Sequence, residues 1–346
     1  MKTVNVFGMP LRTKFITSIA ALWMAAQPSV SALAQQHQPL IIAHRGASGY
    51  VPEHTAAAVV MAHAMNADFI EQDVVLSRDH VPVVLHDVKL DAVTNVASVF
   101  PERKRANGSY YAIDFSFAEL QQLTVNERRH ASQAGQLFPQ RYQGGHPHFT
   151  IMSLAEQLSL IKHLNVSRQR NVGVYIEIKA ARWHREQQYD VTQAVVKVLK
   201  QHQYLTEQPP TAIYLQSFDP EVLRRLQREF HLTMIPLIQL IAHNSWNESP
   251  VDYDAMLTAA GLESLRTYAH GVGLWIEHVL EGVDDQQQPQ FSRVVENAHA
   301  AGLKVHVYTL RRDQLPAGVS SYEQLLQWLQ RHGVDGLFTD FPDVRG

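Results

Sequence analysis

Short apolar runs recur along most of the chain, with polar, helix-like segments between them. The runs, each of strand length, are PLIIAHRG, DFIEQDVVLS, VPVVLHD, NVGVYIEIK, TAIYLQSF, TMIPLIQLI, HGVGLWIE, LKVHVYTL and VDGLFTDF. Helical patterns fall at 55–66, 153–164, 186–202, 220–230, 292–301 and 322–332. Continuous apolar strands that alternate with helices are typical of a parallel sheet covered on both faces. About eight such units in a chain of this length predict an α/β fold, a (β/α)₈ TIM barrel.

One pair of strands breaks this rhythm. Only residues 78–80 separate DFIEQDVVLS from VPVVLHD, which is far too short for a parallel crossover. The two runs should form an antiparallel hairpin. If residues pair symmetrically about its turn, His86 returns beside Gln72, between Glu71 and Asp73. The hairpin then gathers two carboxylates and an imidazole in a small space.

The segment from about 89 to 150 has a different composition. It is rich in charge, Gln, Gly and Pro, as in ERKRANGSYY and RYQGGHPH, and it lacks long apolar runs. We interpret it as a small insertion that follows the strand hairpin. Two hypotheses remain open: a lid over a binding site, or a solvated excursion with no role in binding.

The first 34 residues have the pattern of a signal peptide. Three basic residues precede an apolar run at 15–26, and Ala32-Leu33-Ala34 is a small-x-small cleavage pattern. The alternatives are an N-terminal membrane anchor and a frayed amphipathic helix, but the apolar run is shorter than the roughly 20 residues that a membrane span needs. Cleavage after Ala34 would leave an exported catalytic domain at 39–346 with no stable membrane insertion. In a Gram-negative bacterium this domain would be periplasmic.

Charge and cysteine content exclude several classes of function. The net charge is -3 and the basic residues form no stripe, so a nucleic-acid partner is not expected. The chain has no cysteine, which excludes thiolate nucleophiles and Cys-based zinc sites. A chain of 346 residues can be stabilised by core burial without disulfides.

Polar side chains interrupt the apolar runs where several strands end. They are His44 and Arg45, Glu71 and Asp73, Glu177 and Lys179, Gln216 and Ser217, and Asp340. In a (β/α)₈ barrel the carboxyl ends of the strands form the mouth that holds the active site. We therefore expect these residues to form one site.

Three of the carboxylates suit a metal ion. Glu71 and Asp73 are two residues apart in one strand, so both point to the same face, and Glu177 lies on another strand. Three carboxylates that face one interior repel one another unless a cation neutralises them. Oxygen ligands favour a hard cation, Ca²⁺ or Mg²⁺. The alternative is a salt-bridge cluster with Arg45 and Lys179.

Two histidines are candidates for proton transfer. A lone strand histidine is often a core residue, but His44 and His86 should both project at the mouth, beside a metal and a cation. Two imidazoles that flank one phosphate can act as base and acid, each accelerating the reaction by about 10²–10⁴-fold.

Together the motifs HRGASGYVPEHT, EQDVVLSRDHVPVVLHD, EIKA and GLFTDFPD resemble the glycerophosphodiester phosphodiesterase family, most closely its periplasmic bacterial type. The resemblance covers about residues 39–343. It implies hydrolysis of glycerophosphodiesters to sn-glycerol 3-phosphate and an alcohol. It also implies attack by the glycerol 2-hydroxyl, through a cyclic phosphate that water then opens.

The resemblance also implies a role for each matching residue. His44 would be the general base and His86 the general acid. The metal ligands, with Ca²⁺ expected and Mg²⁺ as the other candidate, would be Glu71, Asp73 and Glu177. The substrate-binding residues would be Arg45 and Lys179 on the phosphate and Glu53 near the glycerol or metal.

Two aromatic residues are candidates for an apolar wall of the substrate pocket, Phe218 and Trp275, although core packing explains them equally well. GVGLWIEHVL, which contains Trp275, departs from the family pattern and leaves the glycerol-side specificity open.

Two other functions use the same features. A lipid-cleaving phosphodiesterase of the phospholipase C or D kind shares the barrel and paired histidines, but it would need an apolar or basic surface run that the mature sequence lacks. A non-catalytic binding protein for phosphodiesters would need the cations but not both histidines. The expected partner is a small-molecule glycerophosphodiester. The pattern does not fix the oligomeric state, and a homodimer is compatible with it.

Overall fold

The computed structural model describes residues 38–130 and 135–344. The predicted signal peptide at 1–34 and its cleavage site lie outside the described residues.

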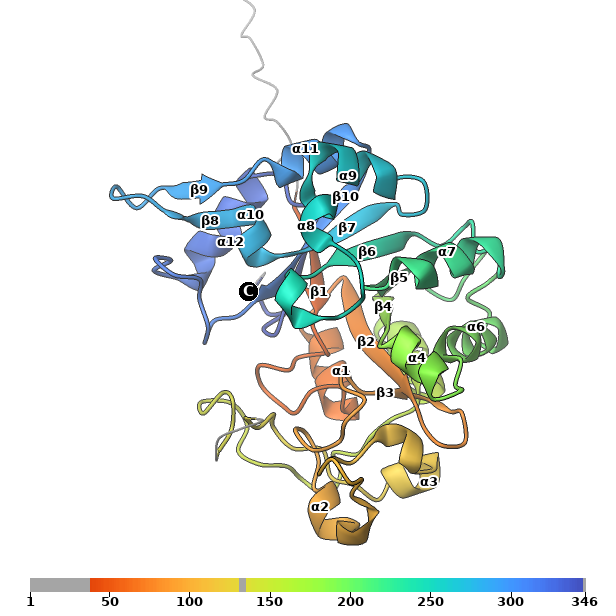
Figure 1. Ribbon diagram of the computed structural model, residues 1–346. Helices are drawn as coiled ribbons and strands as arrows, with labels where there is room; N and C mark the ends of the chain where they lie inside the picture. Colours follow the sequence, from red (N-terminus) through yellow and green to blue (C-terminus); the bar gives the residue numbers. More distant parts are fainter. Residues whose placement is uncertain (1–37, 131–134, 345–346) are drawn as a thin grey trace, which may run out of the picture. The chain divides into compact units, whose positions relative to one another are not determined.

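Eight parallel strands close into a barrel, as the sequence pattern predicts (Figure 1). They are β1 (Leu40–Ala43), β2 (Phe69–Leu76), β4 (Gly173–Ile178), β5 (Ile213–Ser217), β6 (Leu237–Ile241), β7 (Gly271–Trp275), β10 (Lys304–Leu310) and β11 (Gly336–Thr339). Closure occurs at β1, which pairs with β11 on one side and with β2 on the other. The predicted (β/α)₈ architecture is therefore confirmed.

Helices follow most barrel strands. They are α1 (Ala56–Ala64), α4 (Leu154–Arg168), α5 (Ala181–Glu186), α6 (Val191–Gln201), α7 (Pro220–Arg228), α8 (Tyr253–Leu257), α9 (Ala259–Leu265), α10 (Ile276–Val279), α11 (Val294–Ala300) and α12 (Tyr322–Arg331). Thr55 caps α1, and Ser153 with Glu156 forms a capping box at the start of α4. A two-stranded hairpin, β8 (Leu280–Val283) with β9 (Pro289–Phe291), adds to this set.

The helix predicted at 186–202 forms, but it begins later than expected, because Glu186 is the last residue of α5 and α6 starts only at Val191. The chain leaves the helical conformation after α5, and Gln188 has a φ of 66°. Asp190 then starts α6, its side chain accepting a hydrogen bond from the backbone N–H of Gln193.

The predicted antiparallel hairpin forms between β2 and β3 (Pro82–Val84). Its register pairs Val74 with Val84, the symmetric pairing expected from the sequence. On the same edge of β2, β1 pairs only with Phe69 and Ile70. The strand β2 thus changes partner along its length, and the hairpin carries His86 to the mouth of the barrel.

The insertion at 89–150 has a hydrophobic core of its own. It contains α2 (Val96–Val99), α3 (Phe117–Leu120) and two 3₁₀ turns, at Pro101–Arg103 and Ala112–Asp114. Its buried residues include Leu90, Tyr110, Phe115 and Leu123, and they pack with Val75 and Val83 of the hairpin. The hairpin therefore belongs to two cores, with one face toward the insertion.

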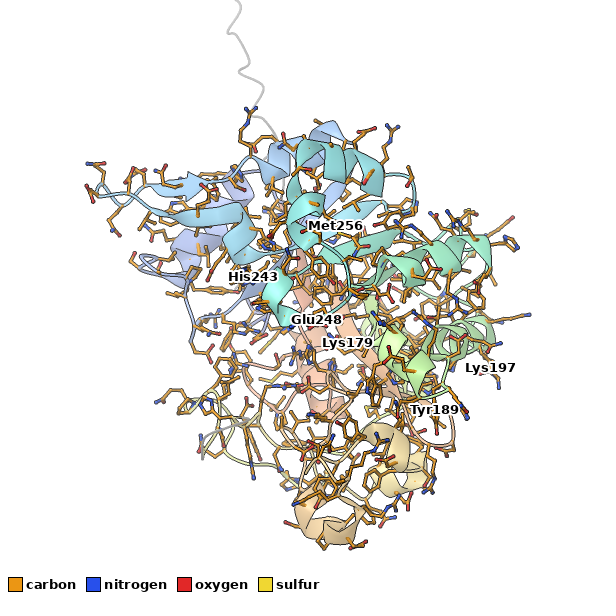
Figure 2. All side chains as sticks on the ribbon, in the orientation of Figure 1. Lys179, Tyr189, Lys197, His243, Glu248 and Met256 are labelled. Carbon is orange, nitrogen blue, oxygen red and sulfur yellow. The ribbon has the colours of Figure 1, made fainter. Side chains whose placement is uncertain are left out.

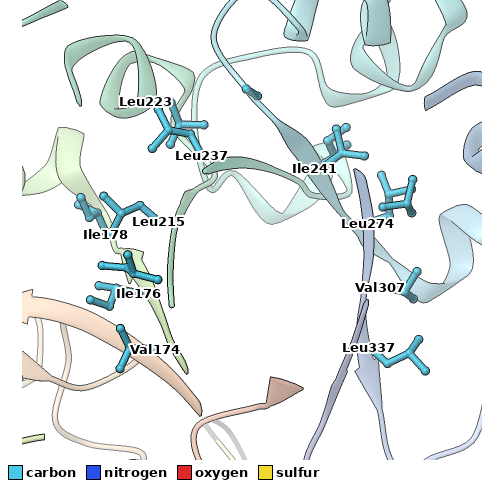
Figure 3. Close-up of a cluster of buried hydrophobic side chains, with 14 of the residues drawn as sticks. Val174, Ile176, Ile178, Leu215, Leu223, Leu237, Ile241, Leu274, Val307 and Leu337 are labelled. Carbon is cyan, nitrogen blue, oxygen red and sulfur yellow. The ribbon is translucent and has the colours of Figure 1, made fainter. Parts of the chain in front are cut away.

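Strand alternation separates the barrel interior from its outer layer. Figure 3 shows Val174, Ile176 and Ile178 of β4 in the hydrophobic cluster that also includes Leu215 and Leu223. The residues between them, Tyr175 and Glu177, point to the other face.

An aromatic and aliphatic floor fills the lower barrel, formed by Ile42, Phe69, Tyr175, Ile238 and Phe338. Carboxylates follow higher on the same inner faces, at Glu71 and Asp73 of β2 and Glu177 of β4.

In the part of the chain described here, no helix is both long and apolar enough to cross a bilayer.

His184 joins α5 to the barrel in a way that requires a neutral imidazole. It is fully buried. Its Nε2 accepts a hydrogen bond from the backbone N–H of Leu76 at 3.2 Å, while its Nδ1 lies 3.0 Å from the carbonyl oxygen of Ala180. Burial lowers the pKa of His184 to about 4.

We predict that the free energy of unfolding depends on pH through His184. In the unfolded chain the pKa is near its ordinary value of 6.5, so the unfolded state binds the proton more readily. The stabilisation of the neutral side chain, about 3 kcal/mol, is present above pH 6.5 and is lost as the pH falls toward 4. Urea unfolding from pH 4 to pH 8 should show a smaller loss of stability at low pH in His184→Gln than in the wild type. The exposed His163→Gln serves as the control. Parallel stability curves for the wild type and His184→Gln would contradict the prediction.

Candidate functional site

A tight turn after β1 presents two of the predicted residues. The N–H of His44 donates to the carbonyl of Thr339 at 2.9 Å, and the N–H of Arg45 donates to the Glu71 carboxylate at 3.0 Å. Gly46 follows with a φ of 80°, and a Cβ there would lie 2.8 Å from backbone atoms of Ala58. Only glycine satisfies both conditions. The HRG motif is thus a turn that packs against α1 and points its first two side chains at the mouth.

Three carboxylates meet inside this mouth, as strand alternation predicts. One oxygen each from Glu71, Asp73 and Glu177 lies within 4.8 Å of the other two, and all three residues are buried. Burial and the neighbouring carboxylates raise the pKa of both Glu71 and Glu177 well above the ordinary value. Concentrated, desolvated negative charge is the environment that a cation relieves.

The acidic group fits a hard divalent cation by a second criterion. Oδ1 of Asp73 is buried and has no hydrogen-bond partner among the described residues. A buried carboxylate oxygen without a partner is costly, so it requires a ligand that the protein does not supply. Oxygen donors match Ca²⁺ or Mg²⁺. Glu71, Asp73 and Glu177 can therefore hold such an ion.

Cationic side chains partly neutralise the same carboxylates. Lys179 Nζ lies 2.9 Å from Glu177 Oε1, and Arg45 Nε lies 3.5 Å from Asp73 Oδ2. The salt-bridge alternative considered for the sequence therefore coexists with the metal-type geometry. These two cations do not satisfy Asp73 Oδ1, which remains open to an ion.

His44 is held in one orientation. Its Nδ1 lies 2.5 Å from Asp340 Oδ1, and its Nε2 is 3.8 Å from Glu71 Oε2. Burial, with Arg45 as a second cause, lowers the pKa of His44 to about 4. The imidazole is therefore neutral at pH 7. With Nδ1 donating to Asp340, its Nε2 lone pair is free to accept a proton.

His86 repeats this arrangement from the other side. Its Nδ1 lies 2.7 Å from Asp87 Oδ1, and its Nε2 is 3.3 Å from Lys179 Nζ. Burial lowers the pKa of His86 to about 3, with Arg45 and Lys179 as further causes. An anionic phosphate bound between these cations would offset their effect and favour the protonated imidazole.

One cavity of about 450 Å³ joins these groups. Both histidines, the three carboxylates, Arg45, Phe218 and Trp275 line it. Two of the predicted substrate-binding residues, Lys179 and Glu53, are not among the residues that line this cavity. Lys179 is buried between Glu177 and His86, and Glu53 lines a neighbouring cavity of about 180 Å³, where it bonds to Arg45 and Arg128.

An aromatic and acidic rim surrounds part of the main cavity. The centroids of the Trp246 and Trp275 rings are 5.1 Å apart, and the ring planes meet at 62°. The exposed carboxylates of Glu248 and Glu277 also line this cavity. Burial lowers the pKa of Lys179, but Glu177 and Glu248 raise it more. Figure 2 shows Glu248 and Lys179 on neighbouring segments of the chain.

Sequence reasoning missed several residues of this site. His54 Nε2 contacts Asp73 Oδ2 at 2.8 Å and so fixes a carboxylate of the acidic group. Arg128 and Arg141 contact the carboxylates that hold the two histidines. Asp87 follows His86 directly, and this HD pair was the available signal. The two arginines lie on irregular segments and Trp246 ends a short 3₁₀ helix, Asn244–Trp246, so no periodicity marks them.

Comparison with known proteins identifies the family. The model of the glycerophosphoryl diester phosphodiesterase family matches residues 44–344. The chain belongs to this family. Glycerophosphodiester phosphodiesterases of Haemophilus influenzae and Treponema pallidum are 34% and 32% identical to it, over 97% and 88% of this chain and 98% and 90% of theirs. Glycerophosphodiester phosphodiesterase activity is thus assigned by homology.

Solved structures agree with the fold. A phosphodiesterase of Oleispira antarctica, in complex with the product sn-glycerol-3-phosphate, superposes with a TM-score of 0.59 at 23% identity and covers 88% of this chain and 94% of its own. A glycerophosphodiester phosphodiesterase of Agrobacterium tumefaciens gives 0.55 at 20% identity, over 89% and 99%. These likenesses confirm the barrel of the phosphodiesterase family.

We predict that a divalent cation stabilises the folded protein through the acidic group. At a concentration of 100 times Kd, an ion that binds only the folded state adds about 2.7 kcal/mol to the free energy of unfolding. The melting temperature should therefore rise on addition of Ca²⁺ or Mg²⁺ and fall again with a chelator. The shift should be lost in Glu71→Gln and kept in Glu263→Gln, a surface control. Because Glu71 and Glu177 must lose their protons, the affinity should weaken as the pH falls. An equal shift in wild type and Glu71→Gln would place the ion elsewhere.

Proposed function

We propose that the protein hydrolyses deacylated phospholipids, such as glycerophosphocholine and glycerophosphoethanolamine, to sn-glycerol 3-phosphate and an alcohol. One observation carries this proposal: two imidazoles, each bonded through Nδ1 to an aspartate, line one cavity with three buried carboxylates. In the mechanism that follows, the Nε2 of each imidazole acts on the substrate, and at His86 the substrate replaces the 3.3 Å contact with Lys179 Nζ. A site that only binds a phosphodiester has no need of two such histidines.

The first step is attack by the 2-hydroxyl of the glycerol. His44 Nε2 takes the proton of this hydroxyl, and the oxygen attacks phosphorus. The bond from phosphorus to the alcohol oxygen breaks, and His86 Nε2 donates a proton to that oxygen. Asp340 stabilises the imidazolium that forms at His44. The products of the step are the free alcohol and a cyclic glycerol phosphate.

Water opens the cyclic phosphate with the roles exchanged. His86, now neutral, takes a proton from the water, whose oxygen attacks phosphorus. The bond from phosphorus to the glycerol 2-oxygen breaks, and His44 returns its proton to that oxygen. The product is sn-glycerol 3-phosphate, and both imidazoles regain their starting states.

Electrostatic stabilisation of the phosphoryl oxygens completes the site. Arg45 faces the cavity beside both histidines, and Lys179 adds a second positive charge next to His86. A divalent ion held by Glu71, Asp73 and Glu177, for which we propose Ca²⁺, would supply further positive charge there. Glu53 contacts both Arg45 and Arg128, and we propose that it holds Arg45 in place.

The lining of the cavity rim favours the binding of alcohols that carry a positive charge. Trp246 and Trp275 line the cavity, and aromatic rings attract an ammonium group through cation–π interaction, as Lys179 Nζ over the Phe218 ring at 5.3 Å illustrates. Glu248 and Glu277 add negative charge to the same cavity. Choline and ethanolamine combine a cation with a small apolar surface, and they match this lining better than glycerol does.

We predict that the purified mature protein releases sn-glycerol 3-phosphate from glycerophosphocholine. Release should require Ca²⁺, stop with a chelator, and fall by at least about 100-fold in His44→Ala and in His86→Ala. The value of kcat/KM should be higher for glycerophosphocholine than for glycerophosphoglycerol. Coupled detection of glycerol 3-phosphate gives all of these rates.

Controls for this prediction separate its parts. Glu248→Gln should lower kcat/KM for the choline substrate and leave the glycerol substrate unchanged; equal effects would remove the rim from specificity. A substrate without the 2-hydroxyl should not be cleaved, and its cleavage would exclude the cyclic intermediate. Hydrolysis of micellar lysophospholipid alone, with no soluble diester cleaved, would favour the lipid phosphodiesterase instead.

We propose that the enzyme is exported and acts in the periplasm. Support comes from the first 34 residues, whose basic start, apolar run and Ala32-Leu33-Ala34 pattern are those of a cleavable signal. Protein recovered from the periplasm of a Gram-negative host should begin at Gln35 when sequenced from its N-terminus. A recovered chain that still begins at Met1 would contradict the proposal.

A further inference from the structure

The insertion reaches the two histidines through two arginines. Arg128 Nη1 donates to Asp87 Oδ2 at 2.6 Å, and Asp87 Oδ1 is the oxygen that bonds to His86. Arg141 Nη2 donates to Asp340 Oδ2 at 2.7 Å, and Asp340 Oδ1 bonds to His44. Each histidine is thus the end of a chain of contacts that runs from imidazole to carboxylate to guanidinium.

The two chains differ in how many cations hold the carboxylate. Asp340 Oδ2 accepts from Arg311 at 2.8 Å as well as from Arg141, and Arg311 comes from the barrel. Asp87 has no second guanidinium within hydrogen-bond distance among the described residues. Arg128 is therefore the contact that fixes Asp87, whereas Arg141 is one of two that fix Asp340.

Arg128 is itself rigidly placed. Its Nε and Nη2 form a bidentate pair with Glu53, at 3.0 and 2.7 Å, and Glu53 also accepts from Arg45. On the backbone, Glu127 donates to Gly144 at 2.7 Å and Arg129 to Ala92 at 2.9 Å. A planar guanidinium whose three nitrogens are all hydrogen-bonded to carboxylates is held in one orientation. Arg128 is therefore able to impose that orientation on Asp87.

We propose that Arg128 is a positioning residue for the leaving-group step. Through Asp87 it sets the orientation of His86, so that Nε2 points at the oxygen of the departing alcohol. Arg141 acts on His44 in the same manner, but Arg311 duplicates it. The insertion thus completes the acid half of the site. This inference rests on the proposed activity, with His86 as the proton donor to the alcohol.

The leaving group offers a direct test. The alkoxides of choline and other alcohols are poor leaving groups, so these alcohols need the proton from His86 to depart. A p-nitrophenyl ester of glycerol phosphate releases p-nitrophenolate, a stable anion that departs without a proton. Misplacing His86 should therefore slow glycerophosphocholine and have little effect on the p-nitrophenyl ester, whereas general damage to the fold slows both.

The experiment compares Arg128→Met, Arg141→Met and the matched control Arg105→Met, each with both substrates and saturating Ca²⁺. Arg105 makes a bidentate pair with Asp114 inside the insertion and touches no residue of the site. Arg128→Met should lower kcat on glycerophosphocholine by about 10- to 100-fold with a similar KM, and on the p-nitrophenyl ester by several-fold less. Arg128→Lys, which keeps one donor, should recover part of kcat. Arg141→Met should cause a smaller loss that does not depend on the leaving group.

Each outcome has one meaning. Suppose that His86→Ala loses more activity on glycerophosphocholine than on the p-nitrophenyl ester. The inference is then overturned if Arg128→Met lowers kcat equally on both substrates, or on neither. A His86→Ala variant without that dependence refutes the assignment of His86 as the acid, and a wild type inactive on both substrates refutes the proposed function. If Arg128→Met does not fold, as judged by circular dichroism, Arg128→Lys decides alone. A loss specific to glycerophosphocholine supports the inference, and wild-type rates on both substrates overturn it.

Discussion

Three carboxylates that share the mouth of a closed barrel impose the constraint on which the rest of this structure depends. The floor beneath them is aromatic and aliphatic, so they have no route to bulk water except through the cavity. Positively charged side chains reduce the repulsion among the three carboxylates. Arg45 and Lys179 lie beside the carboxylates, and Asp73 keeps one oxygen for an ion. The substrate phosphate is an anion, and it enters a site where Arg45 and Lys179 are paired with the carboxylates.

The two histidines show how a buried imidazole can be kept ready for proton transfer. Burial alone would leave each ring neutral and free to rotate. The aspartate on Nδ1 fixes the ring and the tautomer, and burial keeps both imidazoles unprotonated. At His86 the neighbouring Arg45 and Lys179 add to this effect, so the charge balance around that ring differs from the balance around His44.

The parts of this protein that follow a short period were predictable from sequence. Period-two alternation places Glu71, Asp73 and Glu177 correctly, and the three-residue turn fixes the register that brings His86 to the mouth. Long-range ion pairs were not predictable in this way. The contact between Arg128 and Asp87 joins residues 41 positions apart, one of them on an irregular loop. The apolar residues of the insertion are scattered among charged ones, so their common core becomes visible only in three dimensions. The start of α6 was placed too early because residues 186–189 are compatible with a helix, whereas the cap at Asp190 sets the actual start.

The change of partner along β2 has a consequence for how this architecture can diverge. The barrel closes at β1 over the first two residues of β2, and everything above that point on the same edge belongs to the hairpin. Residues added or removed between β3 and α4 therefore interrupt no ladder of the closed barrel. A lineage can lengthen, shorten or replace this segment and still keep its acidic centre intact. The barrel and the insertion are joined as modules, and a descendant that exchanges the insertion alters the contacts that hold the two histidines before it alters the three carboxylates.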